Sequence, residues 1–251
     1  MARVAIVTGA AQGIGRAIAL KLAASGVDVV VADISPKQEA CEQVVKEIEA
    51  LGRKGLAVTG DVSKEPDVQA IVQKTVEVLG GLDIMVANAG INKTSSILDL
   101  TDKNFDTIMD VNVKGVLYCY RAAAVQMIKQ GRGGRIIGAS SRAGVIGENN
   151  NAAYSASKFA VRAITQTAAL EWGQHNITVN SYAPGIAHTE MLTSTLAPTP
   201  ENLDKIIPAN APIRRIGTPE EIAEVVCFMA SPGASYVTGQ TIGVNGGFLL
   251  S

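Results

Sequence analysis

A phenol and an amine stand four residues apart, at Tyr154 and Lys158, in a segment of helical composition. Residues at this spacing share one face of a helix. A free phenol titrates near pH ~10, too high for proton exchange at neutral pH, and a neighbouring ammonium would stabilise the phenolate. We therefore expect Tyr154 to be a general acid and base, although for the pair taken alone an incidental contact on a helix face is the better interpretation.

A glycine-rich run opens a second helical segment near the start of the chain. It reads TGAAQGIG over residues 8–15 and contains Gly9, Gly13 and Gly15. Such glycines let the backbone turn tightly and approach a pyrophosphate, while the helix N-terminus offers free N–H groups and a partial positive charge. The spacing is not GxGxxG, so a tight strand-to-helix turn without a ligand is an equal alternative.

Asp33 ends a second apolar run, about 20 residues beyond the glycines, where a carboxylate can hydrogen-bond the adenosine ribose hydroxyls. The same charge would repel the 2′-phosphate of NADP. Gln12 rather than a cation occupies the turn. These residues favour NAD over NADP. Lys37 opposes that preference, and the alternative role of Asp33 is to cap the following helix.

Short β-branched runs alternate with longer helical segments, which is typical of a parallel sheet covered on both faces. We therefore predict an α/β fold, a single-domain, doubly wound, Rossmann-like sheet of seven parallel strands, with residues 1–251 forming one dinucleotide-binding catalytic domain. The predicted strands are Val4–Val7, Asp28–Ala32, Gly55–Val58, Ile84–Ala87, Arg135–Gly138, Thr178–Tyr182 and Thr241–Val244.

Three further segments have recognisable signals. The run TPEE at residues 218–221 predicts a helix start with an N-cap, an early proline and a capping-box glutamate. The segment from Asn104 to Gln130 is helical but contains Asn112, a poor helix former. Residues 188–214 are irregular and rich in Thr, Pro, Ala and Asn, which predicts a substrate loop or lid.

Composition excludes several classes of protein. With 47% hydrophobic and 18% charged residues the chain can bury a large core, and a net charge of −1 gives no basic field for nucleic acid or anionic lipid. The three cysteines are scattered along the chain, which favours small buried residues in a protein of a reducing compartment. No apolar run approaches the length of a membrane-spanning helix. We expect a cytoplasmic protein without nucleic-acid or membrane partners. Neither His175 nor His188 indicates a metal site, although His188 borders the expected substrate pocket.

Several motifs recur together in a fixed order. They are Thr8-Gly9-x-x-x-Gly13-Ile14-Gly15, Asp61-Val62, Asn88-Ala89-Gly90, Asn112, Ser141, Tyr154-x-x-x-Lys158 and Pro184-Gly185. With this ordered set the chain resembles the short-chain dehydrogenase/reductase family over essentially its full length. The departures from the family pattern are Ala87 and Gly138, which concern packing near the sheet more than chemistry.

The resemblance implies a catalytic tetrad of Asn112, Ser141, Tyr154 and Lys158. Tyr154 would exchange the proton, and Lys158 would hold the nicotinamide ribose as well as tune the phenol. Ser141 would hydrogen-bond the substrate oxygen. Ser140 is its possible substitute, but the separation of Ser140 from Tyr154 differs by one residue from the family pattern. Asn112 would distort its helix and hold a water in a proton relay to the lysine.

The resemblance also implies a nicotinamide cofactor, NAD in preference to NADP, and a set of contacts to it. These are Gly9, Gln12, Gly13, Ile14, Gly15, Asp33, Asp61, Val62, Asn88, Ala89, Gly90, Tyr154, Lys158, Pro184, Gly185, Ile186 and Thr189.

Within the family the chain looks most like acetoin/diacetyl reductases, also called butanediol dehydrogenases, so a small ketone or secondary alcohol is the expected substrate. A 3-oxoacyl-thioester reductase that uses NADPH is the alternative enzyme, and a non-catalytic NAD-sensing protein is the alternative of another class. The family commonly forms homotetramers through the helices around residues 104–130 and 152–172 and the C-terminal strand, so a homotetramer is expected.

Overall fold

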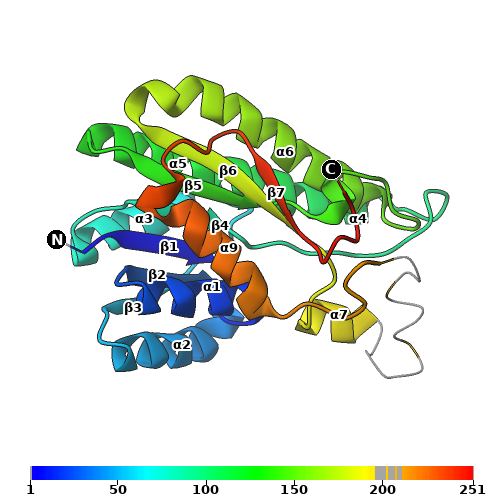
Figure 1. Cartoon of the computed structure of the whole chain (residues 1–251), viewed down its shortest axis with the longest axis horizontal. Helices are drawn as coiled ribbons and strands as arrows, with labels where there is room; N and C mark the ends of the chain where they lie inside the picture. The colour runs from blue at the N-terminus through cyan, green and yellow to red at the C-terminus, as the bar shows by residue number, and fades with distance from the viewer. Residues whose placement is uncertain (1, 196–201, 203–206, 208–210, 251) are drawn as a thin grey trace.

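Seven parallel strands form one sheet in a computed structural model that describes residues 2–195, 202, 207 and 211–250 (Figure 1). Their order is β3-β2-β1-β4-β5-β6-β7. The strands are β1 Val4–Thr8, β2 Asp28–Asp33, β3 Gly55–Thr59, β4 Ile84–Ala87, β5 Gly134–Ala139, β6 Ile177–Pro184 and β7 Thr241–Val244. All seven predicted strands are confirmed, with ends that differ from the expected ones by two residues at most.

Helices cover both faces of the sheet, which confirms the doubly wound arrangement. Helices α1, α2 and α9 pack on one face, and α3, α5 and α6 on the other (Figure 1). The helix bounds are α1 Gly13–Ala24, α2 Gln38–Ala50, α3 Glu65–Leu79, α4 Asp102–Met109, α5 Gly115–Gln130, α6 Ala152–Trp172, α7 Glu190–Thr195 and α9 Pro219–Ala230.

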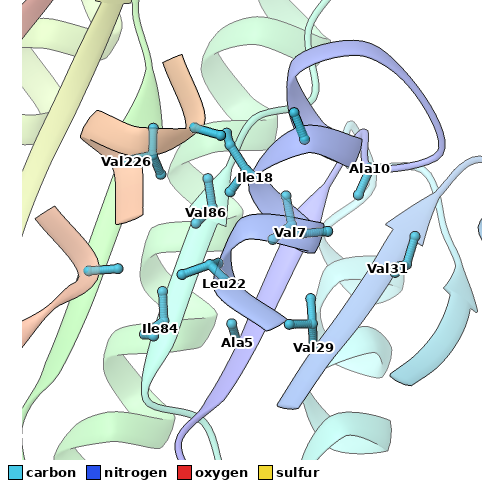
Figure 2. Packing of buried hydrophobic residues seen from close by; sticks show 14 of the residues in the cluster. Ala5, Val7, Ala10, Ile18, Leu22, Val29, Val31, Ile84, Val86 and Val226 are labelled. Atoms are coloured by element: carbon cyan, nitrogen blue, oxygen red, sulfur yellow. The ribbon is translucent and has the colours of Figure 1, made fainter. Parts of the chain in front are cut away.

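The central strands are apolar on both sides, because a layer of helices buries each side. On β1, Ala5 and Val7 point to the face of α1, whereas Ile6 points to the opposite core. Figure 2 shows Ile18 and Leu22 of α1 packed over the first of these faces, with side chains from β1, β2 and β4 around them. This packing fixes the helix that begins at the glycine turn.

The strand order reverses between β1 and β4. From β1 the chain builds outward to β2 and β3, and from β4 it builds the other way to β5, β6 and β7. In doubly wound sheets the crevice outside the carboxyl ends of the strands at such a point is where ligands bind. The fold therefore directs attention to the loops that follow β1 and β4.

The predicted start of α9 is confirmed. The Thr218 hydroxyl accepts a hydrogen bond from the Glu221 N–H at 3.3 Å, and the Glu221 carboxylate accepts one from the Thr218 N–H at 2.9 Å. This is a complete capping box. None of the described helices is long and apolar enough to cross a membrane.

Two segments are less regular or more regular than a simple helix or loop. The helix predicted over residues 104–130 is divided into α4 and α5 by a turn of π-helix at Asp110–Lys114, which contains Asn112 and confirms the expected distortion of the helix at this residue. The loop predicted at residues 188–214 is not wholly irregular, because α7 forms at its start. Residues 196–201, 203–206 and 208–210 of that loop lie outside the described residues.

Candidate active site

A cavity of about 450 Å³ lies at the carboxyl ends of the strands on both sides of the β1/β4 reversal. Fifteen predicted site residues line it: Gly9, Gln12, Gly13, Ile14, Gly15, Asp33, Asp61, Val62, Asn88, Ala89, Gly90, Tyr154, Lys158, Pro184 and Thr189. The other four, Asn112, Ser141, Gly185 and Ile186, are not among the lining residues. The structure therefore gathers most of the predicted site around one space.

Tyr154 and Lys158 lie on the same face of α6, as their spacing predicts. The Lys158 ammonium is 5.4 Å from the centre of the Tyr154 ring. It is buried and donates a hydrogen bond to the Ala139 carbonyl at the end of β5, at 2.9 Å. The Ser141 side chain hydrogen-bonds the Tyr154 hydroxyl. A phenol and an ammonium thus meet at one corner of the cavity, and the Ser141 hydroxyl lies behind the cavity lining, next to the phenol.

The pKa values of Tyr154 and Lys158 correct the expectation that the phenol pKa is lowered. Burial raises the pKa of Tyr154 to about 12, the hydrogen bond to Ser141 opposes the rise, and the charge of Glu148 adds to it. Burial also lowers the pKa of Lys158 to about 8. The predicted lowering of the phenol pKa is therefore wrong for the chain alone, because the cost of burying a phenolate outweighs the hydrogen bond to Ser141.

The two neighbouring serines have different environments. The Ser140 hydroxyl donates to the Lys158 backbone carbonyl at 3.2 Å, which ties the end of β5 to α6. Ser141 instead caps a short 3-10 turn, accepting from the Ala143 N–H at 3.1 Å, and reaches Tyr154. Of the two hydroxyls, it is therefore Ser141 that shares a hydrogen bond with the phenol, as its spacing from Tyr154 suggests.

Asn112 is fully buried in the π-turn, and its amide is committed to protein partners. Its oxygen accepts from the Ile91 N–H at 2.8 Å, and its nitrogen donates to the Ile91 carbonyl at 2.9 Å and to the Ser157 hydroxyl at 3.1 Å. These bonds fasten the loop after β4 to the π-turn and to α6. The relay water expected at Asn112 stays a prediction, and the two amide hydrogens would not bind it, because they are already used.

Gly90 lies beside both the Asn112 amide and the Lys158 ammonium. A Cβ at this position would come within 3.2 Å of the Asn112 amide oxygen and 3.3 Å of the Lys158 ammonium. A larger residue would therefore crowd both. At Gly138, one of the departures from the family pattern, a Cβ would collide with the Tyr120 hydroxyl, which explains the glycine as a packing requirement.

Asn88 joins three strands at the reversal. Its amide nitrogen donates to the carbonyls of Thr8 at 2.8 Å and Gly9 at 3.1 Å, and its amide oxygen accepts from the Tyr182 hydroxyl on β6 at 2.7 Å. The Thr8 hydroxyl in turn accepts from the backbone N–H groups of Asn88 at 3.0 Å and Ala89 at 3.1 Å. The side chain of Asn88 therefore supports the glycine turn.

The glycine turn itself presents an open helix end. Gly9 and Gly13 have positive φ angles, of 62° and 55°, which glycine adopts without strain. At Gly15 a Cβ would collide with the Gly9 carbonyl. Gln12, at the N-cap of α1, makes no capping hydrogen bond through its side chain. The N-terminal N–H groups and the helix dipole thus face the cavity and suit a pyrophosphate.

Asp33 lies at the other end of the cavity, beside this turn. One oxygen of its carboxylate accepts from the Ala11 N–H at 3.0 Å, and the other from its neighbour Ile34 at 2.9 Å. The alternative, that Asp33 caps the following helix, is wrong, because Ile34 is the N-cap of the 3-10 turn at Ser35–Lys37 and its cap lacks a side-chain hydrogen bond. The carboxylate belongs to the cavity.

Other predicted contacts have different outcomes. Asp61 accepts hydrogen bonds from the backbone and hydroxyl of Ser63, at 3.0 and 2.7 Å, while it lines the cavity. Thr189 lies at the start of α7, with its methyl group 3.6 Å from where a Cβ of Gly13 would be. Ile186 lines a second cavity, of about 120 Å³, and so does not reach the first one through its side chain.

The remaining expectations concern histidine, cysteine and metal. His188 is exposed and absent from the cavity lining, and His175 is exposed in a turn after α6. Cys41 and Cys119 are buried as expected, whereas Cys227 is partly exposed. Within the described part of the chain no three His, Cys, Asp or Glu side chains are placed to hold a metal ion.

Sequence reasoning missed several residues of the site. Tyr182 was assigned only to a strand, yet its hydroxyl holds Asn88. Ser157 hydrogen-bonds Asn112, and the charge of Glu148 raises the pKa of Tyr154. The partners of Tyr182 and Ser157 are distant in the sequence, so spacing along the chain gave no signal for these two. Glu148 is close to Tyr154 in the sequence but belongs to no motif.

The fold and the cavity together define a dinucleotide-binding protein, and comparisons with known proteins give the family. The family model described as Enoyl-(Acyl carrier protein) reductase matches residues 9–249. A short-chain dehydrogenase/reductase of Armillaria gallica is 49% identical over 251 residues, covering 99% of this chain and 96% of that protein. The chain belongs to the short-chain dehydrogenase/reductase family.

Relatives with different substrates are equally similar to this chain. The 3-oxoacyl-[acyl-carrier-protein] reductase of Staphylococcus aureus is 40% identical, covering 100% of this chain and 99% of that protein. The L-2,3-butanediol dehydrogenase of Corynebacterium glutamicum is also 40% identical, and each covers all of the other. The crystal structure of acetoin dehydrogenase from Salmonella typhimurium matches with a TM-score of 0.89 and 36% identity over 99% of this chain and 96% of that one.

These findings show an oxidoreductase that acts on CH–OH groups or the corresponding ketones with a nicotinamide cofactor. The cavity fits such a cofactor, because an open helix N-terminus with glycines stands between the carboxylate of Asp33 and the pair of Tyr154 and Lys158.

The joint at Asn88 gives a testable prediction. Asn88→Ala should lower the free energy of unfolding by about 2–4 kcal/mol, because it leaves two carbonyls and a buried hydroxyl without their partner. Tyr182→Phe removes only one of these bonds and should cost about 1 kcal/mol. Urea denaturation followed by circular dichroism measures both. Equal losses of unfolding free energy in the two variants would contradict the role of the Asn88 amide in holding the three segments together.

Proposed function

We propose that this protein is an NAD(H)-dependent oxidoreductase that interconverts a small ketone and its secondary alcohol, with acetoin, diacetyl or butanediol as the leading substrates. The observation that carries the choice of cofactor is the Asp33 carboxylate, held in the cavity by two backbone N–H groups. A carboxylate in this position suits ribose hydroxyls and repels a 2′-phosphate. The substrate class is supported by the similarity to the butanediol and acetoin dehydrogenases.

Two alternatives compete with this proposal. A 3-oxoacyl-thioester reductase using NADPH is supported by the equal identity to the Staphylococcus aureus enzyme. A cation at Gln12 would favour that reading, and glutamine stands there instead. A non-catalytic NAD sensor is the weaker alternative, because Tyr154, Lys158 and Ser141 come together as an acid–base group.

Tyr154 is the proposed proton donor in reduction and acceptor in oxidation. Its raised pKa keeps the proton on the phenol at neutral pH, which suits donation to a carbonyl oxygen. Ser141, bonded to the same hydroxyl, would hydrogen-bond the substrate oxygen and stabilise the charge that develops on it. The bound nicotinamide supplies or accepts the hydride. Lys158, with a pKa of about 8, carries positive charge at neutral pH and offsets negative charge left on the phenol.

We assign the cofactor contacts by their place around the cavity. Asp33, Asp61 and Val62 would surround the adenosine, and the glycine turn would hold the pyrophosphate. Tyr154 and Lys158 would hold the nicotinamide ribose, with Pro184 and Thr189 near the carboxamide. Asn88 would act through the glycine turn rather than by its own side chain, since its amide is fully used.

We further propose that residues 1–251 form one catalytic domain and that the enzyme is a homotetramer built through α5, α6 and β7. Large apolar side chains on these two helices are exposed in the single chain, among them Leu170 at 87% and Val125 at 65%. A subunit interface along these helices would bury such side chains.

The proton-transfer role predicts distinct effects for neighbouring hydroxyls. Tyr154→Phe should lower kcat about 10²- to 10⁴-fold, because it removes the acid–base group. Ser141→Ala should lower kcat about 10²-fold by removing a donor to the reacting oxygen. The matched variant Ser140→Ala should cost less than tenfold. Steady-state kinetics with diacetyl measures all three; undiminished turnover in Tyr154→Phe, or a larger loss at Ser140 than at Ser141, would contradict these roles.

The cofactor and substrate assignments predict a change of preference at Asp33. The wild type should reduce diacetyl with NADH faster than 3-oxoacyl thioesters with NADPH. Asp33→Ala should lower kcat/KM for NADH about 10- to 100-fold, through loss of charge-assisted hydrogen bonds, and should raise kcat/KM for NADPH. Rates with both cofactors on a panel of diketones, acyloins and acyl thioesters measure this.

Glu39→Gln is the matched control for Asp33→Ala. It removes an exposed carboxylate from the first turn of α2, away from the cavity lining, and should leave both rates unchanged. Wild-type preference for NADPH and acyl thioesters would support the alternative reductase and overturn the proposal.

A further inference from the structure

A lysine stands beside the carboxylate that is proposed to exclude NADP. The Lys37 ammonium donates to the side-chain oxygen of Gln12 at 2.5 Å and lies 3.9 Å from the Glu190 carboxylate. All three residues line the cavity. Glu190 belongs to α7, at the start of the predicted substrate loop, so this contact connects that loop to the glycine turn.

Lys37 and Asp33 contact consecutive residues of the turn. Asp33 binds the backbone of Ala11, and Lys37 binds the side chain of Gln12. Consecutive Cα atoms are about 3.8 Å apart, so the ammonium and the carboxylate approach the same edge of the cavity. A cation is therefore close to the place where the 2′-phosphate of NADP would lie beside Asp33.

A free ammonium at this edge would favour NADP, because lysine binds phosphate as a point charge. In the structure the ammonium already has an anionic partner in Glu190. A phosphate would have to compete with that carboxylate for Lys37 and would also meet its negative charge. The carboxylate of Asp33 alone therefore does not explain a preference for NAD, because the same edge of the cavity also contains the Lys37 ammonium.

We propose that Glu190 is a cofactor-specificity residue, which holds the Lys37 ammonium and so withholds it from a 2′-phosphate. The inference rests on the proposed preference for NAD and extends it, because it gives the substrate loop a part in choosing the nucleotide. It also accounts for Lys37, whose charge by itself argues against that preference.

The expected effect is modest. The side chains of Lys37 and Glu190 are 40% and 68% exposed, and ion pairs between exposed groups are weak and screened by salt. Releasing the lysine should therefore change phosphate affinity by about three- to fivefold at low ionic strength, and by less in 0.5 M salt.

Binding of adenosine 2′,5′-bisphosphate and of 5′-AMP, measured by titration calorimetry on the full chain, tests the proposal without turnover. Glu190→Gln should bind the bisphosphate about three- to fivefold more tightly than the wild type and bind 5′-AMP equally well. The double variant Glu190→Gln with Lys37→Gln should lose that gain. Glu47→Gln is the matched control, because it breaks the Arg16–Glu47 ion pair, 2.5 Å long and outside the cavity lining, and should bind both ligands as the wild type does.

An unchanged bisphosphate affinity in Glu190→Gln would overturn the inference. A gain that persists in the double variant would overturn it too, since Glu190 would then act without Lys37. The ratio of wild-type rates with NADH and NADPH is measured separately. A wild type that prefers NADPH would defeat the proposed function itself, whereas a wild type that prefers NADH together with no effect at Glu190 would defeat this inference alone.

Discussion

Lys158 is 3% exposed, so its ammonium lies in a protein interior, where burial disfavours a charge. It donates to the Ala139 carbonyl, and in the part of the chain that the structure describes it has no carboxylate partner. Asp28, a carboxylate that is also buried, differs because Arg53 pairs with it at 2.6 Å. The interior thus tolerates one positive charge close to the phenol of Tyr154. The proposed chemistry depends on that charge. A phenol with a pKa near 12 holds its proton at neutral pH, so proton transfer needs the ammonium to offset the negative charge left on the phenolate.

Much of the surrounding architecture positions this ammonium. The end of β5 supplies its acceptor, α6 places it one turn from Tyr154, and Gly90 leaves room for it beside Asn112. The π-turn between α4 and α5 brings the Asn112 amide to the loop after β4. Such turns are frequent at functional sites. Across the strand reversal, Asn88 after β4 holds the glycine turn that follows β1, and Tyr182 on β6 holds Asn88. The two ends of the cavity are thus connected by hydrogen bonds.

The sheet and most residues that line the cavity could be predicted from the sequence, because both follow from local signals. Buried parallel strands are apolar runs, a capping box is four residues long, and Asp33 is recognisable from its distance to the glycines. What sequence could not predict are contacts between distant segments, such as Tyr182 with Asn88 or Lys37 with Glu190. The direction of the Tyr154 pKa was also missed, since burial depends on the whole fold and not on the spacing of two residues.

Titration of Lys158 by NMR tests the central claim most directly. Protein labelled at the lysine side chains is followed from pH 6 to 11 without added cofactor, and the Lys158 signal is assigned by its loss in Lys158→Met. Because burial disfavours the charged form, the signal should titrate near pH 8, well below the value of about 10.4 for a lysine in a model peptide. A Lys158 signal that titrates at the model-peptide value would show that the ammonium is not held in the interior and would contradict this account of the site.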